Sequence, residues 1–512
     1  MGSDFSPAVW EVPRRLTEKV AEKLFDDKSL IIKHRARLDK LTWGRKLGKI
    51  PSKELVPAHK TETHQGVLME SGEPANTPHH MFVDDDIYTE VFCKARVEQA
   101  IASSIEAVFI ILGQSDTKLR QDPVSWDKLE EMTINYSNII LGVVVDTRRM
   151  RVGPKREFLQ KVIKLLKGPW NEHRQSFTLK EAETLAGQLN HIANTALWLK
   201  HLMSHIYTSI AAALKTNKAY LIGTNKHFRD QLKLAKATAY TRKEHMEQTF
   251  AQAETSRKIH NNRKIHFLVP TLRAELKLIR EALELEWLDK STPIAHLIPG
   301  IIDATMYGDS SLDSAGGWST DMELWWWIDW SQRVRVRTLR HVKDGSDGTL
   351  IDINCLEYAT ILINYAAAYC FWVTMSNLKR RGIPYPRVLI YADNQSSEYW
   401  AIKGCKRSFT GRRLGRLQCA MMMGNPVGLD TGHVTTKFNV IADRISRWKQ
   451  DTDLLLNFDV LQKEFPQLHN CRRFLPSPQL ISLVEDVLLS DKLPSPTKVN
   501  QTLRNFPGRI VS

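Results

Sequence analysis

Strands and helices alternate between residues 301 and 448, and acidic residues stand at the ends of several of them. Asp309 lies in a strand that precedes a glycine-rich turn at residues 316–318, and Glu357 opens an almost wholly apolar helix that ends near residue 372. Alternation of this kind predicts an α/β or α+β domain, with a sheet covered by helices. This pattern limits the fold of the chain more than any other feature.

Two further acids complete the series. Asp393 ends the apolar strand 388–392, and Asp443 lies in a helix that follows a polar loop beginning at His433. Each acid alone has an ordinary explanation, because Asp forms turns at strand ends and Glu stabilises helix N-termini. Four acids on different elements, in this order, favour instead a site for two Mg²⁺ ions, with Mn²⁺ as a substitute, since such ions prefer oxygen ligands.

A basic cluster follows the third acid. It contains no acidic residue, and the aromatic residues Trp400 and Phe409 lie close to it in the sequence. Its charges fit the phosphates of a nucleic acid, although a solvated helix face would have the same composition. Its members are Lys403, Lys406, Arg407, Arg412, Arg413 and Arg416.

The overall composition agrees with a nucleic-acid partner and argues against a membrane protein. The formal charge of the chain is +15, which favours polyanions, although many basic chains have other partners. Hydrophobic residues make up 42% of the 512 residues, as in ordinary multidomain globular proteins. The longest apolar run, residues 365–374, is about half the length of a membrane span.

The six cysteines and the N-terminus indicate a reducing compartment. No two cysteines form a CxxC pair, so neither a zinc module nor a disulfide framework is expected, and the thiols should be free. No secretory signal is recognisable in residues 1–15. An intracellular protein is expected, and the sequence does not distinguish the cytoplasm from the nucleus.

The N-terminal half contains two predicted hairpins. Asp84 and Asp85 lie in an acidic turn between short strands at residues 81–83 and 87–92, and alternation over residues 138–152 predicts a second hairpin. Helices are expected over residues 95–112, 154–167, 178–192 and 197–214, with Thr178 and Glu181 forming a capping box.

Residues 307–447 resemble the ribonuclease H (RNase H) domain of retrotransposon polyproteins. Gly308-Asp309-Ser310 and Ala392-Asp393-Asn394 are similar to its first and third acidic motifs, and residues 433–447 are similar to its histidine loop and Asn-x-x-Ala-Asp-x-Leu/Ile-Ser-Arg ending. The resemblance implies an RNase H-like fold, a mixed five-stranded sheet flanked by helices, that cuts the RNA strand of RNA/DNA hybrids. It implies that two metal ions are held by Asp309, Glu357, Asp393 and Asp443.

The same resemblance implies that His433 assists proton transfer or product release. The alternative is a loop histidine without a role. The basic cluster lies where related enzymes carry a helix that grips the hybrid.

Upstream, Phe82-Val83-Asp84-Asp85 resembles the Tyr-x-Asp-Asp motif of reverse transcriptase palms, in which two aspartates bind the catalytic metals. Residues 141–146 are similar to the Leu-Gly-containing primer-grip hairpin. Together, most of residues 82–447 resembles a retrotransposon polyprotein fragment of gypsy-like or tyrosine-recombinase elements. The resemblance implies a palm, a helical thumb and connection, and association with other retroelement proteins.

The chain departs from the family at its N-terminus, because only about eighty residues precede Asp84. The fingers are expected to be absent and the reverse transcriptase to be truncated and inactive, although surviving polymerase activity stays an open alternative. Asp4 is one candidate for the missing palm acid, and residues 65–67 are a weak match to the nucleotide-pocket motif.

The expected organisation has five parts. These are a truncated palm (1–95), the palm end with thumb and connection helices (96–215), a basic helical connector (216–299), the RNase H-like domain (300–448) and a loosely packed C-terminal tail (449–512). Two other functions compete with the nuclease. One is a vestigial nucleic-acid-binding protein without catalysis, and the other is a different nuclease or scaffold with the same fold, since one fold hosts several functions.

Overall fold

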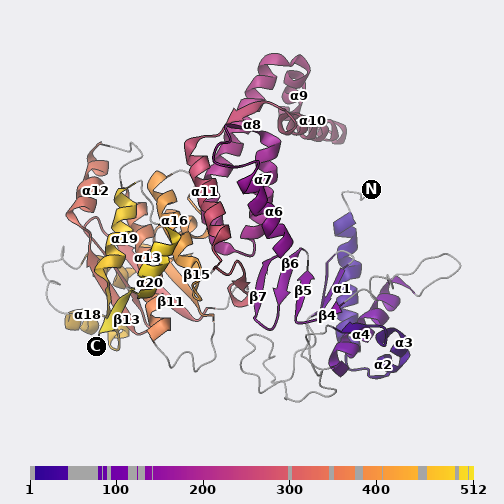
Figure 1. Ribbon diagram of the computed structural model, residues 1–512, viewed down its shortest axis with the longest axis horizontal. Helices are drawn as coiled ribbons and strands as arrows, with labels where there is room; N and C mark the ends of the chain where they lie inside the picture. The colour runs from indigo at the N-terminus through magenta and orange to yellow at the C-terminus, as the bar shows by residue number, and fades with distance from the viewer. Residues whose placement is uncertain are drawn as a thin grey trace. The chain divides into compact units, whose positions relative to one another are not determined.

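The chain is a mixed α/β multidomain protein, mostly helical, with a seven-stranded mixed sheet (Figure 1). It divides into two compact units, Met1–Arg149 and Met150–Ser512. The computed structural model describes residues 6–43, 79–82, 85–88, 94–113, 124, 133–140, 142–286, 288–297, 302–344, 351–374, 385–405, 408–447, 458–490, 495–505 and 507–511.

In the first unit, helices pack around a small apolar core that includes Leu30, Leu38 and Ile105. The first predicted hairpin is confirmed, because β2 pairs antiparallel with β3. In the second predicted segment, 138–152, β5 pairs antiparallel with β6, and residues 151–152 belong to a further strand, so the segment is more than one hairpin. Gly142, in the turn between β5 and β6, has a φ of 82°, a conformation that glycine adopts at little cost. The elements are α1 (Ser6–Leu24), α2 (Ser29–Lys33), α3 (Arg35–Leu38), β1 (Thr42–Trp43), β2 (His79–Phe82), β3 (Asp85–Tyr88), α4 (Lys94–Leu112), β4 (Thr133–Ile134), β5 (Ser137–Ile140) and β6 (Val143–Asp146).

The second unit begins with a helical body. The predicted capping box is confirmed, since Thr178 accepts a hydrogen bond from the Glu181 amide and the Glu181 carboxylate accepts one from the Thr178 amide. Apolar residues of α7, η3 and α11 form its core. The elements are β7 (Arg151–Pro154), α6 (Arg156–Lys167), β8 (Ser176–Thr178), α7 (Leu179–Ala193), η3 (Leu197–Leu202), α8 (Ser204–Thr224), α9 (Lys226–Lys236), α10 (Arg242–His260), β9 (Ile265–Phe267), α11 (Pro270–Glu284), β10 (Thr292–Pro293) and η4 (Ile294–His296).

The large sheet follows in the same unit, with the strand order β15-β14-β11-β12-β13-β16-β17. β11 pairs parallel with β14 and antiparallel with β12, so the sheet is mixed, as expected. The strands are β11 (Ala304–Ser310), β12 (Ser314–Ser319), β13 (Leu324–Asp329), β14 (Arg387–Ala392), β15 (Gly428–His433), β16 (Arg472–Pro476) and β17 (Gly508–Val511).

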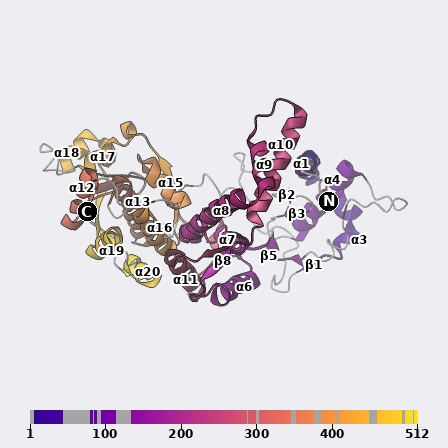
Figure 2. The same cartoon turned by 90° about the horizontal axis from the view of Figure 1, so that it is seen from above.

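Helices cover both faces of this sheet (Figures 1 and 2). One face packs on α13, which is apolar almost throughout because it is buried on nearly every side. On the other face, Ile445 of α17 packs with Trp318 and Trp325. The remaining helices are α12 (Gln332–Asp344), α13 (Ile353–Thr374), α15 (Gln395–Lys403), α16 (Phe409–Met422), η5 (Thr436–Phe438), α17 (Val440–Ser446), α18 (Phe458–Glu464), η6 (Pro466–Leu468), α19 (Pro478–Leu489) and α20 (Pro496–Asn505).

The expected glycine-rich turn at residues 316–318 is wrong, because these residues lie inside β12. A Cβ on Gly317 would lie 2.6 Å from the Trp326 Nε1 and 2.9 Å from the Tyr307 carbonyl oxygen. On Gly316, a Cβ would meet the side chain of Ile445. The glycines are therefore needed for close approach of helices on both faces, and not for a turn.

Gly317→Ala is expected to destabilise the protein by about 1–3 kcal/mol, because the added methyl group has no space. Gly187→Ala is the matched control, since Gly187 lies exposed in α7 with nothing near its Cβ position. The control should stabilise the helix by about 0.5–1 kcal/mol. Urea unfolding of both variants measures the difference, and equal effects would contradict the packing argument.

The C-terminal segment is not the loosely packed tail that its prolines suggested. β16 and β17 extend the large sheet, which is why it has seven strands rather than the expected five. Leu480 and Val484 of α19 belong to the core of the sheet. Two of the prolines begin helices instead of breaking them: Pro478 is the first residue of α19, after the N-cap Ser477, and Pro496 is the first residue of α20. Pro476 is the last residue of β16.

Two expectations about the whole chain can be compared with the described residues. None of the helices there is long and apolar enough to cross a membrane. Buried cysteines, none of them in a disulfide between described residues, are Cys355, Cys370, Cys405, Cys419 and Cys471.

Candidate metal centre

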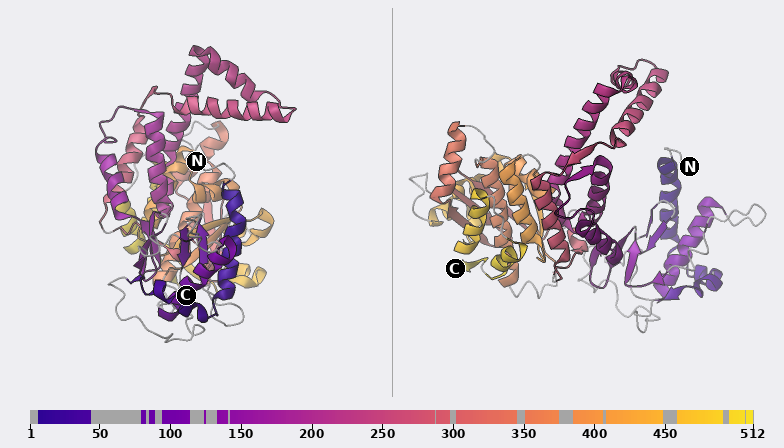
Figure 3. Two further views of the ribbon diagram at one scale, coloured as in Figure 1. Left: turned by 90° about the vertical axis from the view of Figure 1, so that its right-hand side faces the viewer. Right: turned by 45° about the horizontal axis from the view of Figure 1, so that its top comes forward.

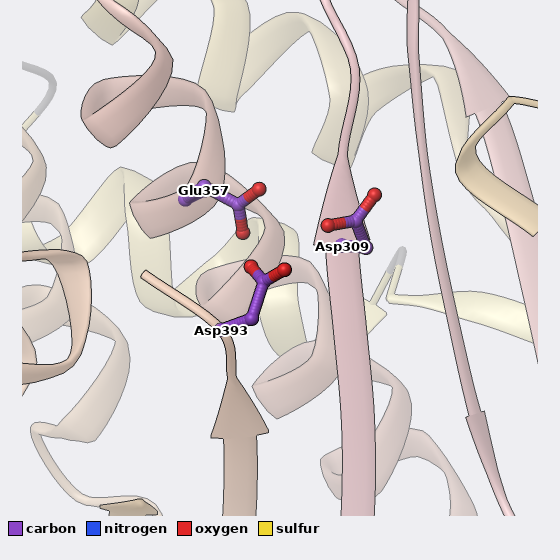
Figure 4. A group of neighbouring side chains, drawn as sticks. All are labelled: Asp309, Glu357 and Asp393. Carbon is purple, nitrogen blue, oxygen red and sulfur yellow. The ribbon is translucent and has the colours of Figure 1, made fainter. Parts of the chain in front are cut away.

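Three of the predicted acids meet in the second unit. Asp309 lies near the end of β11, Glu357 in the first turns of α13, and Asp393 directly after β14. One carboxylate oxygen from each lies within 4.8 Å of the others. Figure 4 shows the three side chains pointing toward one another from two strands and a helix. Parallel pairing of β11 with β14 brings two of these acids to the same edge of the sheet.

Buried polar contacts hold α13 against β11. Asn364, two helical turns after Glu357, accepts a hydrogen bond from the Trp326 indole at 2.7 Å and donates to the Tyr307 carbonyl at 3.4 Å. The Ser310 amide donates to Glu357 Oε1 at 3.0 Å. These contacts fix the position of the helix and of its carboxylate. Glu357 Oε2 is buried and has no hydrogen-bond partner among the described residues.

The electrostatics of the group favour binding of a cation. Burial raises the pKa of Asp309 to about 6. The Asp393 and Asp443 carboxylates contribute to this rise, and a hydrogen bond from the Ser446 hydroxyl opposes it. Burial, followed by repulsion from Asp309, raises the pKa of Glu357 well above its usual range. Carboxylates that are buried and repel one another are stabilised in their charged form by a divalent cation.

Asp443 lies close to the three acids without joining their group. Its Oδ1 forms an ion pair with the guanidinium of Arg447, four residues later, at 2.7 Å. Its charge is near enough to raise the pKa of Asp309. The structure therefore brings three of the four predicted ligands together and places the fourth beside them.

His433 is near the third acid. It ends β15 opposite Ala392, and its Nε2 lies 3.1 Å from the Asp393 carbonyl oxygen. The imidazole is exposed. His433 therefore lies beside the backbone of the third acid and in contact with solvent.

Three polar residues that support the acids were not predicted as site residues. Ser446 donates to Asp309, Asn439 donates to the Gly308 carbonyl at 3.1 Å, and Thr436 donates to Asp393 at 3.0 Å. Ser446 and Asn439 are buried. All three belong to the segment 433–447 that carried the resemblance: Thr436 begins η5, Asn439 precedes α17, and Ser446 ends it. Membership of this segment was the available signal.

The basic cluster does not form one exposed surface in the described residues. Arg413 is buried and donates to the Thr410 hydroxyl and the Leu488 carbonyl. Arg416, mostly buried, lies 3.9 Å from the carboxylate of Glu275 in the helical body. Lys403 is exposed and lies over the Tyr399 ring. Of the other members, Arg412 is partly buried, and Lys406 and Arg407 lie outside the described residues.

The predicted polymerase acids are described only in part. Asp85 is the first residue of β3, paired with Phe82, so it lies at the start of a strand and not in the turn predicted for it. Asp84 lies outside the described residues, as do Asp4 and residues 65–67. The polymerase site stays a prediction.

The comparisons with known proteins give no independent name to the site. No protein-family model matches the chain, and no curated protein matches it.

The donor set fits Mg²⁺. All three grouped side chains offer hard oxygen ligands, which Mg²⁺ prefers to nitrogen or sulfur. The buried oxygen of Glu357 without a hydrogen-bond partner is the atom that most needs such an ion, because burying an uncompensated carboxylate is costly. The group can hold a divalent cation at the edge of the sheet, next to solvent on the side of Asp393.

Proposed function

We propose that the chain is a ribonuclease H that hydrolyses the RNA strand of RNA/DNA hybrids with two Mg²⁺ ions. The observation that carries this proposal is the convergence of Asp309, Glu357 and Asp393. Such ions would lower the pKa of the attacking water and stabilise the leaving oxyanion. The three acids would hold them, with Asp443 as the fourth ligand implied by the resemblance.

The strand arrangement supports an RNase H-like fold. Five neighbouring strands, β13-β12-β11-β14-β15, have antiparallel pairs on one side of β11 and parallel pairs on the other. Within the seven-stranded sheet, this arrangement supports the mixed five-stranded core that the resemblance implies. The truncated reverse transcriptase of a retroelement polyprotein is the proposed origin of the N-terminal half.

The chain's own residues position the acids. The Ser446 hydroxyl orients the carboxylate of Asp309, and the Ser310 amide orients that of Glu357. Exposed His433, beside Asp393, is placed to move a proton or to assist release of the product. These contacts keep the ligands preorganised.

A vestigial binding protein is the competing function. Gripping a nucleic acid requires cations on a surface and does not require three carboxylates grouped at the edge of a sheet. Two of them, Asp309 and Glu357, have raised pKa values because of burial, which is unfavourable for the charged form. The presence of grouped carboxylates despite this cost favours a catalytic site over a binding surface.

The purified chain with Mg²⁺ is expected to cut the RNA of a labelled RNA/DNA hybrid into fragments with 5′-phosphates. Gel separation of the labelled products measures cleavage. A DNA duplex of the same sequence is the control and should remain intact, as should the hybrid in EDTA. A chain that binds the hybrid but never cuts it, in Mg²⁺ or Mn²⁺, would establish the vestigial function. Primer extension on the same hybrid is expected to give little or no product.

A further inference from the structure

The hairpin formed by α9 and α10 carries rows of exposed side chains for which the proposed nuclease site has no use. The two helices pack on each other and on α8. They extend from the end of α8 away from α11, as the labels of Figure 1 show, and Figure 3 gives two further views of the same helices. The loop between them includes Tyr240, of which 87% is exposed.

One row runs along α9. Lys226, Arg229, Lys233 and Lys236 are spaced three or four residues apart, so they lie on one side of the helix. All four are exposed. They extend over about 15 Å of helix, and Asp230 is the one acid in the helix sequence. A row of cations of this length fits the phosphates of an extended polyanion.

A second row runs along α10. Lys243, Met246, Phe250, Ala253 and Arg257 follow the same spacing, and all are exposed. Met246 is 66% exposed and Phe250 69% exposed, which is unusual for side chains of their size. The row therefore has cations at its ends and apolar surface between them.

Two of the acids of α10 are engaged within the hairpin. Glu244 forms a capping box with Thr241 at the start of the helix. Glu254 pairs with Lys258 at 2.6 Å. Local partners therefore partly compensate these two negative charges. The lysines and arginines of the two rows then make the surface of the hairpin positive.

We propose that the α9–α10 hairpin binds single-stranded nucleic acid, with phosphates along the α9 row and unstacked bases on Phe250 and its neighbours. Charge complementarity selects a polyanion, and the exposed aromatic and apolar side chains select one whose base faces are accessible. A duplex has phosphates but keeps its bases stacked. This inference does not rest on the nuclease proposal, because binding requires no cleavage.

The test uses the full chain and a fluorescent oligothymidine of roughly 12 nucleotides, with affinity measured by anisotropy over a range of salt concentrations. Replacing Lys226, Lys233 and Lys236 by Gln should weaken binding at least about tenfold. It should also lower the slope of log affinity against log salt by about 2. Arg229 is left in place because it donates to the Ile222 carbonyl. Wild type should bind a blunt DNA duplex more weakly than oligothymidine, because the bases of a duplex are stacked and cannot reach Phe250.

Phe250→Ala should weaken oligothymidine binding by about tenfold and leave the salt slope unchanged, because stacking involves no counterions. Phe250→Tyr should keep most of the affinity, since it retains the ring. The matched control replaces exposed Lys161, Lys463 and Lys498, on other helices, by Gln.

Equal losses in the control and α9 variants would overturn the proposal, because net charge alone would explain them. If the α9 and Phe250 variants bind oligothymidine as wild type does, the proposal is also overturned. An acidic protein would then be the partner that fits the hairpin. If wild type shows the expected binding but no hybrid cleavage, the nuclease proposal fails and this one stands.

Discussion

Asp393→Asn is expected to lower the rate of hybrid cleavage by roughly a thousandfold or more, because metal-dependent catalysis is worth several kcal/mol in the transition state. Asp393 suits this test better than the other grouped acids. It is half-buried at a strand end, whereas an amide at position 309 or 357 would bury new donors. Single-turnover cleavage in Mg²⁺ measures the rate.

Glu398→Gln is the matched control for that loss. Glu398 lies five residues later, on α15, and its removal also takes one negative charge from this region. The control should cleave at nearly the wild-type rate, and both variants should bind the hybrid in Ca²⁺ as wild type does. Normal cleavage by Asp393→Asn would contradict the metal site, and weakened binding would assign Asp393 to substrate contact instead.

Local sequence patterns predicted the elements that carry the acids. Glu357 belongs to an apolar run long enough for a buried helix, and Asp393 ends a run short enough for a buried strand. Both segments are apolar in sequence and buried in the structure. The sequence pattern therefore predicted them correctly. The grouping of these acids with Asp309 followed from strand pairing, which the resemblance implied and the residue pattern alone did not.

The role of the basic cluster could not be predicted in this way. α16 carries arginines in a sequence that resembles a solvated face, yet Leu414 and Leu417 face the core of the sheet, and Cys419 and Met423 face that of the helical body. Only tertiary packing shows that a second body covers this helix. The glycines of β12 suggested a turn because the sequence does not show which residues pack on them. In the folded chain, they leave space for the helices on either face of the sheet.

Contacts of α16 join the helical body to the candidate site. Tyr358, the residue after Glu357, donates to Gln418 of α16, and the Gln418 amide lies 3.1 Å from His201 Nε2 in η3. His201 is fully buried, and burial lowers its pKa to about 4. A neutral imidazole is thus part of the packing beside α13. The sheet and the helical body behave as one structural unit, consistent with their shared core residues.

Glu275, at this junction, is expected to make the stability of the protein depend on pH. It is fully buried on α11 and accepts hydrogen bonds from the backbone amides of His205 and Ile206 at the start of α8. Burial raises its pKa from 4.5 to about 7, although those bonds and the nearby Arg416 act in the opposite direction. Between these pH values the folded protein keeps a proton that the unfolded chain has lost, so stability falls as pH rises.

Glu275→Gln is expected to remove the loss of stability that deprotonation of Glu275 causes. That loss is on the order of 3 kcal/mol in the free energy of unfolding between pH 4.5 and 7. An amide oxygen can still accept from the two backbone amides, so capping of α8 should persist. The buried His205, whose pKa is lowered to about 4, and His201 contribute stability that rises with pH in the same window. The contribution of Glu275 is therefore measured as the difference in free energy of unfolding between the variant and wild type at each pH.

Urea unfolding at a series of pH values from about 4.5 to 8 measures that difference. The variant should be as stable as wild type at the acid end and increasingly more stable toward pH 7, with no further change above it. Glu281→Gln, an exposed acid on the same helix, should give a flat difference. A variant that is less stable than wild type at pH 8 would show that the ion pair with Arg416 outweighs the cost of burying the charge, which is the opposite sign.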